Sequence, residues 1–153
     1  MNNQAAGISI VAFIIAVTAS MAYYQFVYLK EANAKPQLPA EVLNPPDSVK
    51  ISILPGSSQP SQLKNFDPKE ARGTLGINNK IIWTNTDTTA HSVTSDNQYK
   101  DQINGPFNSI DSIGLVLPQK TFEFTFTKDG EYAYHCEPHP WMTGKVIIVK
   151  SFV

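Results

Sequence analysis

The chain has 153 residues and a nearly balanced charge, with 12 basic against 13 acidic side chains. Once the N-terminus is set aside, this length allows one domain and not two. Because the sequence contains no basic block, nucleic acid is not expected as a partner. The single cysteine excludes an internal disulfide and a zinc knuckle with two cysteine ligands.

The N-terminal segment contains no charged side chain before Lys30. After a short tail at residues 1–6, residues 7–29 are apolar and long enough to cross a bilayer as a tilted helix. We therefore predict a single-pass transmembrane anchor. Aromatic side chains gather at the C-terminal end of this run, as they do at membrane interfaces: Tyr23, Tyr24, Phe26 and Tyr28.

A cleaved secretory signal is the main alternative for residues 7–29. The triplet Ala32-Asn33-Ala34 resembles a cleavage site, but no basic residue precedes the run, and the run is longer than the apolar part of most signals. A buried helix of a soluble protein is a third possibility. Anchor and signal both place the following domain outside the cytoplasm, and we expect it to remain on the cell membrane, facing the periplasm or the exterior.

Residues 30–47 contain four prolines and no apolar period, which is typical of an extended linker. From residue 48 to residue 153 the pattern is that of β-structure. Apolar residues alternate with polar ones, and turn residues separate the runs. No helical period is evident in this part. The expected strands are residues 48–53, 80–85, 91–95, 121–127, 131–136 and 145–150.

Short strands at this spacing predict an all-β fold, an antiparallel Greek-key β-sandwich preceded by the N-terminal helix or signal segment. The domain is expected to comprise residues 48–153. In the strand 131–136, alternation places Cys136 on the same face as two tyrosines and His135 on the opposite face. We therefore expect Cys136 to point into the core and His135 to point away from it.

Four side chains have the donor types of a mononuclear copper site. Cys136, His139 and Met142 form a Cys-x2-His-x2-Met run, and His91 lies well upstream. One thiolate, two imidazoles and a weak axial thioether are the ligands of a blue copper centre. Two prolines bracket His139 and restrict the loop, so the donors should stay in place when the metal changes oxidation state.

Each of these residues also has a simpler interpretation. A lone buried cysteine is often an inert apolar side chain, a single histidine on a strand is often structural, and a methionine often fills a core. Cys136 and a histidine could also form the nucleophile and base of a cysteine protease. Nothing in the sequence suggests an oxyanion hole or a substrate groove for that reaction. The combination of four donors favours the metal site.

Several separated segments resemble the cupredoxins, the small blue copper proteins, and in particular the plastocyanin and amicyanin group. The short ligand loop is closer to that of amicyanin. In one departure, Ser92 follows the first histidine where many members have an asparagine that helps to hold the ligand loop. The resembling segments are Phe66-Asp67-Pro68, residues 82–87, 91–95, 107–109, 130–136 and 142–149.

The resemblance implies that His91, Cys136, His139 and Met142 bind one copper ion and that the protein carries single electrons between extracytoplasmic redox partners. It is then not an enzyme. The redox partners would dock near Pro138, His139, Pro140 and Trp141. Two alternatives remain at this point. The copper could be open to solvent and act on or sense a small molecule such as nitric oxide, or the domain could store or deliver copper.

Overall fold

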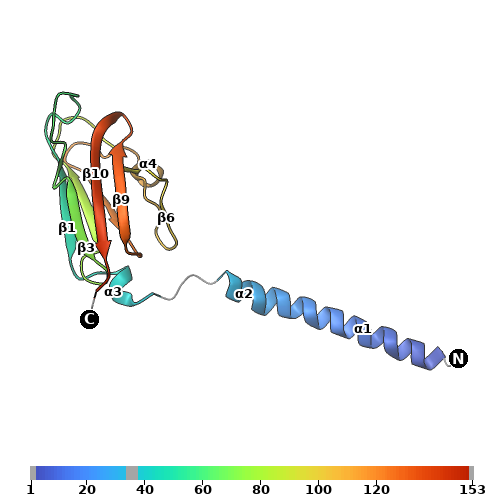
Figure 1. Cartoon of the computed structure of the whole chain (residues 1–153). Coiled ribbons are helices and arrows are strands. Elements are labelled where there is room, and N and C mark those ends of the chain that lie inside the picture. Colours follow the sequence, from blue (N-terminus) through green and yellow to red (C-terminus); the bar gives the residue numbers. More distant parts are fainter. Residues whose placement is uncertain (1–2, 34–37, 152–153) are drawn as a thin grey trace. The chain divides into compact units, whose positions relative to one another are not determined.

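The computed structural model describes residues 3–33 and 38–151 (Figure 1). The chain divides into two compact units, Met1–Pro36 and Gln37–Val153. The first unit is helical, and the second contains the predicted β-sandwich.

The N-terminal unit is one continuous run of helix. It begins as α1 (Asn3–Tyr23), passes through a π-helical turn, η1 (Tyr24–Tyr28), and ends as α2 (Leu29–Ala32). Residues Ile10–Ala32 are long and apolar enough to cross a membrane, and none of the window is buried. A signal sequence has the same properties, so this helix is compatible with both a membrane anchor and a signal. The predicted cleavage triplet lies partly outside the described residues.

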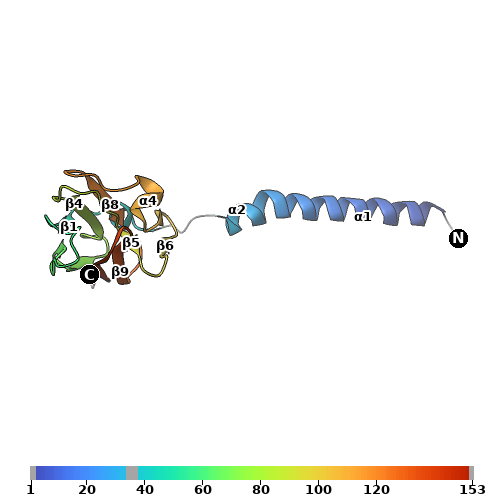
Figure 2. The same ribbon diagram turned by 90° about the horizontal axis from the view of Figure 1, so that it is seen from above.

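The second unit consists mainly of two four-stranded sheets. Figures 1 and 2 show it from the side and from above. The prediction of an all-β sandwich is confirmed. The first sheet has the order β2 (Phe66–Asp67), β1 (Ser48–Ile53), β4 (Lys80–Asn85) and β8 (Thr121–Thr125). The second has the order β3 (Glu70–Thr74), β10 (His139–Val149), β9 (Gly130–Cys136) and β5 (Thr94–Ser95).

The sheets are mixed and not wholly antiparallel as expected. Strands β1 and β4 are parallel, and so are β3 and β10, whereas the other pairs are antiparallel. Between β1 and β4 the chain crosses to the second sheet, where it forms β3. It then crosses back to the first sheet, where β4 runs parallel to β1. No sequence pattern marks this crossing, because the connection contains no helix.

The core lies between the sheets and is rich in aromatic rings. Its side chains come from alternate strand positions, as the period of two predicts. Trp83 and Tyr134 are fully buried and meet edge to face at 5.5 Å between ring centroids. Phe66, Phe107 and Phe126 are buried in the same core, and burial of each phenylalanine side chain contributes roughly 1.5–3 kcal/mol. This packing makes a stiff frame behind the end of β9, where Cys136 lies.

The segment before β1 differs from the predicted extended linker in its second half. Residues Ala40–Leu43 form a short helix, α3, whose Val42 carbonyl accepts a hydrogen bond of 2.8 Å from the side chain of Asn79. The amide of Asp47 also donates to the carbonyl of Ile77. Val42 and Asp47 are therefore hydrogen-bonded to residues of the β-sandwich.

A long connection between β5 and β8 contains further elements that the sequence pattern did not indicate. Strands β6 (Lys100–Asp101) and β7 (Gly105–Pro106) form a small hairpin, and α4 (Ser109–Ser112) follows it. The side chain of Asn108 caps α4 by accepting from the amide of Ile110. Figures 1 and 2 both show β6 and α4 on the same side of the sandwich.

Candidate metal centre

The four predicted donor residues come from three parts of the β-sandwich. Cys136 is the last residue of β9, and His139, its partner across the hairpin, is the first residue of β10. Beyond His139 the pairing shifts and resumes at Thr143, and within this irregular stretch Met142 turns fully into the core. His91 lies outside the named strands, in an isolated bridge to Val116.

Three donor atoms converge. The Nδ1 atoms of His91 and His139 are 3.2 Å apart, and the Sγ atom of Cys136 lies 3.7 Å from the first and 3.5 Å from the second. All three donor atoms lie within 4.8 Å of one another, an arrangement in which one metal ion could contact them all. Cys136, His91 and Met142 are fully buried, whereas His139 is partly exposed.

The donor chemistry fits copper. Burial raises the pKa of the Cys136 thiol, and hydrogen bonds from the Ser92 and His139 amides lower it only in part. Burial also lowers the pKa of His91, which favours the neutral imidazole that a metal requires. A cation between these groups would stabilise the thiolate and separate two imidazole nitrogens that now face each other. A soft sulfur with two imidazoles is the set that copper accepts in a trigonal site.

Asp87 orients His91 and is the main residue of the site that sequence reasoning missed. Its Oδ2 lies 2.9 Å from Nε2 of His91, and both side chains are buried. If Nε2 donates its proton there, Nδ1 presents its lone pair to the metal position. Burial would raise the pKa of Asp87, but hydrogen bonds from His91 and from the amides of Gly56 and Thr88 together lower it to about 2. The only signal was an acidic residue four positions before the histidine.

Ser92 performs the connecting role that its position suggested. Its amide donates to Sγ of Cys136 at 3.3 Å, and its hydroxyl accepts a hydrogen bond of 2.8 Å from the amide of Glu137. The serine in place of asparagine therefore still joins the His91 segment to the hairpin that carries Cys136 and His139.

His135 lies on the opposite face of β9 from its neighbour Cys136. Its Nδ1 is 2.5 Å from a carboxylate oxygen of Asp96, and its side chain is 30% exposed. The cluster of possible metal donors contains His91, Cys136 and His139 and does not include His135. The position of His135 thus agrees with the alternation of the strand.

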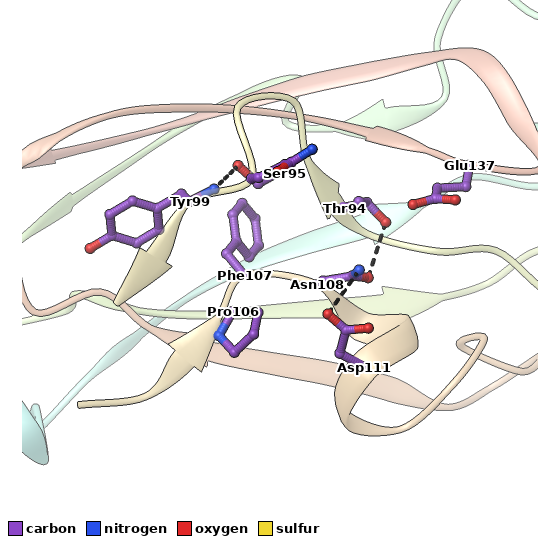
Figure 3. A pocket seen from close by; sticks show the side chains of 9 residues that line it. Thr94, Ser95, Tyr99, Pro106, Phe107, Asn108, Asp111 and Glu137 are labelled. Atoms are coloured by element: carbon purple, nitrogen blue, oxygen red, sulfur yellow. Dashed lines mark hydrogen bonds between the residues drawn. The ribbon is translucent and has the colours of Figure 1, made fainter. Parts of the chain in front are cut away.

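A cavity of about 310 Å³, lined by both polar and apolar side chains, lies next to Glu137, the residue after Cys136, and is shown in Figure 3. Figure 3 shows Glu137 at one end, with Thr94 hydrogen-bonded to Asn108 and Asn108 to Asp111. None of the four expected ligands lines it. The residues that line it are Thr94, Ser95, Gln98, Tyr99, Pro106, Phe107, Asn108, Asp111 and Glu137.

A two-sheet sandwich with a buried cysteine and two histidines converging at one end defines a cupredoxin, a protein that binds a single copper ion. The chain belongs to the family of copper binding proteins described as the plastocyanin/azurin family, whose sequence profile matches residues 58–149. Copper is accordingly the cofactor, and the family supports a role in electron transfer.

Individual relatives agree with this assignment. Amicyanin from Paracoccus denitrificans is 44% identical over 34 residues, which are 22% of this chain and 26% of that protein. Amicyanin-alpha from Methylorubrum extorquens is 34% identical over 84 residues, 54% of this chain and 63% of that protein. The chain thus matches less than two thirds of the length of either relative. A structure described as a novel purple cupredoxin from Nitrosopumilus maritimus is 26% identical, with a TM-score of 0.53, and covers 66% of this chain and 99% of its own.

Proposed function

We propose that this protein is a membrane-attached type 1 (blue) copper protein that carries single electrons between redox proteins outside the cytoplasm. Its ligands are His91, Cys136, His139 and Met142. The observation that carries this proposal is the convergence of three donor atoms within 4.8 Å at the buried end of the sandwich. The complete burial of Met142, three residues beyond His139, supports it as the fourth ligand.

Bound copper supplies a one-electron couple between Cu(I) and Cu(II), whose preferred ligand geometries differ. The fold restrains the ligand side chains, so that neither the geometry preferred by Cu(I) nor the geometry preferred by Cu(II) would be fully reached. Cys136 and His139 are paired across a hairpin, and Pro138 and Pro140 restrict the backbone on each side of His139. Since the ligands need little rearrangement when an electron arrives or leaves, electron transfer is fast.

His139 is the expected route for the electron, because it is the ligand that reaches the surface. Pro138, Pro140 and Trp141 surround it and are exposed, Trp141 by 38%. Further apolar side chains, Leu115 and Leu117, are exposed on either side of Val116, the residue that pairs with His91. A small apolar surface is sufficient for the brief encounters of electron-transfer partners. We propose that redox proteins dock here.

The N-terminal helix supports attachment to the cell membrane, with residues 7–29 as a retained anchor and the copper domain outside the cytoplasm. A retained anchor keeps the carrier in the plane of the membrane, near membrane-bound donors and acceptors. Detection of the intact N-terminus in the membrane fraction tests this, because a cleaved signal would leave a shorter, released protein.

A copper site open to small molecules is the first alternative, and the burial of His91, Cys136 and Met142 argues against it. The cavity next to Glu137 is not lined by any of these side chains. An open site would change its absorption when azide or nitric oxide is added, whereas a closed carrier site would not. A storage or delivery module would release its copper to an acceptor, while a carrier retains it through repeated redox cycles.

The decisive experiment is copper reconstitution of the full-length chain in detergent. We expect an intense thiolate-to-copper absorption band and a narrow hyperfine splitting in electron paramagnetic resonance. His91→Ala should abolish or distort both signals. His135→Ala is the matched control, because it removes the other histidine next to the site and should leave both signals nearly intact. A wild-type protein that stays colourless with cupric salt contradicts the proposal.

A further inference from the structure

We propose that the loop of residues 54–65 is a positioning element for the metal centre, in which Gly56 and Ser57 hold both histidine ligands at once. The loop contributes no metal donor and was not expected to take part in the site. This inference rests on the proposed function, because it assumes that His91 and His139 bind the copper.

The contact to His139 runs through Trp141. The indole Nε1–H of Trp141 donates a hydrogen bond of 3.0 Å to the backbone carbonyl of Ser57, 84 residues earlier in the chain. The same indole ring lies against the imidazole of His139, with 5.3 Å between the ring centroids. Trp141 is therefore fixed at its far edge by the loop, and its ring limits the movement of His139.

The contact to His91 runs through Asp87. The amide of Gly56 donates to Oδ1 of Asp87 at 3.1 Å, while Oδ2 of the same carboxylate meets Nε2 of His91 at 2.9 Å. One carboxylate thus connects the loop to the imidazole. Two adjacent residues of the loop therefore contact the two histidines indirectly. The backbone amide of Gly56 acts on His91 through Asp87, and the backbone carbonyl of Ser57 acts on His139 through Trp141.

The loop is itself well held, which a positioning element requires. Ser57 is fully buried, and its single hydroxyl proton is shared between the carbonyl oxygens of Leu54 and Asn65, which lie 2.6 and 3.1 Å from Oγ. The amide of Leu54 also donates to the carbonyl of Asn65 and closes the base of the loop. Gly56 has a φ of +82°, a conformation that side chains rarely adopt, so the direction of its amide depends on glycine.

The expected consequence is a restraint on the imidazoles that does not depend on the metal. A ligand held from outside cannot swing freely when the charge at the centre changes. We therefore expect the loop to keep the rearrangement on electron transfer small. Residues that orient metal ligands in this way commonly change affinity or activity by 10- to 100-fold when they are replaced.

The first test uses the metal-free full-length chain and nuclear magnetic resonance. The indole N–H of Trp141, assigned by its loss in Trp141→Phe, should exchange with solvent at least about tenfold more slowly than an unprotected indole. Ser57→Ala should remove this protection, because the loop loses the hydrogen bonds that hold its carbonyl in place. Rapid exchange in the wild type would overturn the contact to His139.

The contact to His91 is tested in the same sample. Gly56→Ala should shift the Nε2–H resonance of His91 and speed its exchange, because the strained residue displaces the amide from Asp87. Gly105→Ala is a matched control: Gly105 has a similar φ of +77° and open space around its Cβ position. Equal effects from the two variants, or none from Gly56→Ala, would overturn this part of the inference.

The second test measures electron self-exchange in the copper-loaded protein. Trp141→Phe keeps an aromatic ring beside His139 but removes the hydrogen bond, and it should slow self-exchange by about tenfold. The double variant Trp141→Phe/Ser57→Ala should be no slower than the slower single variant, because both changes break one contact. Leu63→Ala is the control within the loop, since its side chain is 94% exposed.

The outcomes separate this inference from the proposed function. If the wild type forms a blue site, and Trp141→Phe and Ser57→Ala both exchange electrons at the wild-type rate, the positioning role is refuted and the proposed function stands. If the wild type binds no copper, the proposed function fails, and the exchange rates in the metal-free chain still decide whether the loop holds the two imidazoles.

Discussion

The amide of Ser92 donates a hydrogen bond of 3.3 Å to Sγ of Cys136. The two residues lie on different segments, and the serine hydroxyl adds a second bond by accepting from the amide of Glu137 at 2.8 Å. Ser92 thereby fixes the position of the thiol through its backbone amide and the position of the backbone that follows the thiol through its hydroxyl. Hydrogen bonds to a sulfur ligand also influence the potential of a copper site.

Replacement of Ser92 by alanine should retain the bond to sulfur, which comes from the backbone, and remove the partner of the Glu137 amide. Loss of this part-buried hydrogen bond costs about 0.5–1.5 kcal/mol of unfolding free energy. Chemical denaturation of the metal-free protein should show this loss. In the copper-loaded protein, we expect the thiolate absorption band to shift while its intensity is retained.

Ser61→Ala serves as the control for this variant, because it is the same substitution at an exposed serine. It should leave both the unfolding free energy and the absorption band unchanged. A Ser92→Ala protein that matches the wild type in both measurements would show that the hydroxyl does not hold the hairpin.

The strands with alternating apolar residues could be predicted from the sequence because burial on one face leaves a period of two. Ile51 and Ile53 of β1, and Phe122 and Phe124 of β8, are buried at alternate positions in this way. Strand β3 could not be recognised, because Ala71 is its only conventional core residue. Strands of two residues, such as β6 and β7, are too short to have a pattern.

The expected ligands could be chosen from the sequence because the donor types and the spacing of Cys136, His139 and Met142 are unusual. The contacts that support these ligands could not be predicted from the sequence. Asp87 meets His91 from an irregular loop, where a separation of four residues does not fix a geometry. The contact between Trp141 and Ser57 uses a backbone carbonyl, which every residue has, and therefore leaves no trace in the sequence.

Removal of the metal should destabilise the protein, because Sγ of Cys136 and the two Nδ1 atoms are held close together in the fold. A ligand that binds only the folded state stabilises it by about 2.7 kcal/mol at a free concentration one hundred times its dissociation constant. Calorimetry should therefore show a higher unfolding temperature with bound metal. Zn²⁺ should give a smaller increase than Cu²⁺ and no colour.

Cys136→Ser provides the control for metal binding, since it keeps the size of the side chain and removes the thiolate. In this variant, Cu²⁺ and Zn²⁺ should each raise the unfolding temperature by less than they do in the wild type. An equal increase in the wild type and the variant would mean that the ions bind elsewhere.

Asp101 should make the stability of the sandwich sensitive to acid. Its buried carboxylate accepts hydrogen bonds from the amide and hydroxyl of Thr127, at 2.9 and 2.7 Å, and from the amides of Ile103 and Asn104. Burial raises the pKa of Asp101, but these hydrogen bonds outweigh burial and lower it below its usual value. The ionised form therefore stabilises the folded state above about pH 4, and this stabilisation is lost as the pH falls through the lowered pKa.

Asp101→Asn should reduce the unfolding free energy at pH 7 by about 2 kcal/mol, because an amide group then faces donors that need an acceptor. The difference from the wild type should shrink as the pH falls below about 4, because the carboxyl group of the unfolded chain then binds a proton and that of the folded wild type follows at lower pH. Denaturation of the metal-free protein at several pH values measures this. Asp129→Asn is the control, because the side chain of Asp129 is 42% exposed, its 3.9 Å ion pair with Lys150 lies at the surface, and asparagine suits the same turn. A constant difference across the pH range would contradict the role of the charge.

Gly144 lies opposite Tyr134 in the pair β9–β10, and the tyrosine ring passes over it. A Cβ atom at residue 144 would meet the ring and the hydroxyl of Tyr134 at distances that real side chains do not tolerate. Tyr134 cannot move aside easily, because it is fully buried against Phe66 and Trp83. We therefore expect Gly144→Ala to cost about 1–3 kcal/mol through overpacking.

The hydroxyl of Tyr134 makes the origin of this cost testable. Among the described residues it has no hydrogen-bond partner, so Tyr134→Phe alone should be nearly neutral or slightly stabilising. In the double variant, loss of the oxygen relieves part of the clash, and the combined effect should be smaller than the sum of the single effects. Thr143→Ala, at the exposed neighbouring position, controls for a general weakening of β10. If the two effects simply add, the glycine is needed for a reason other than the approach of this ring.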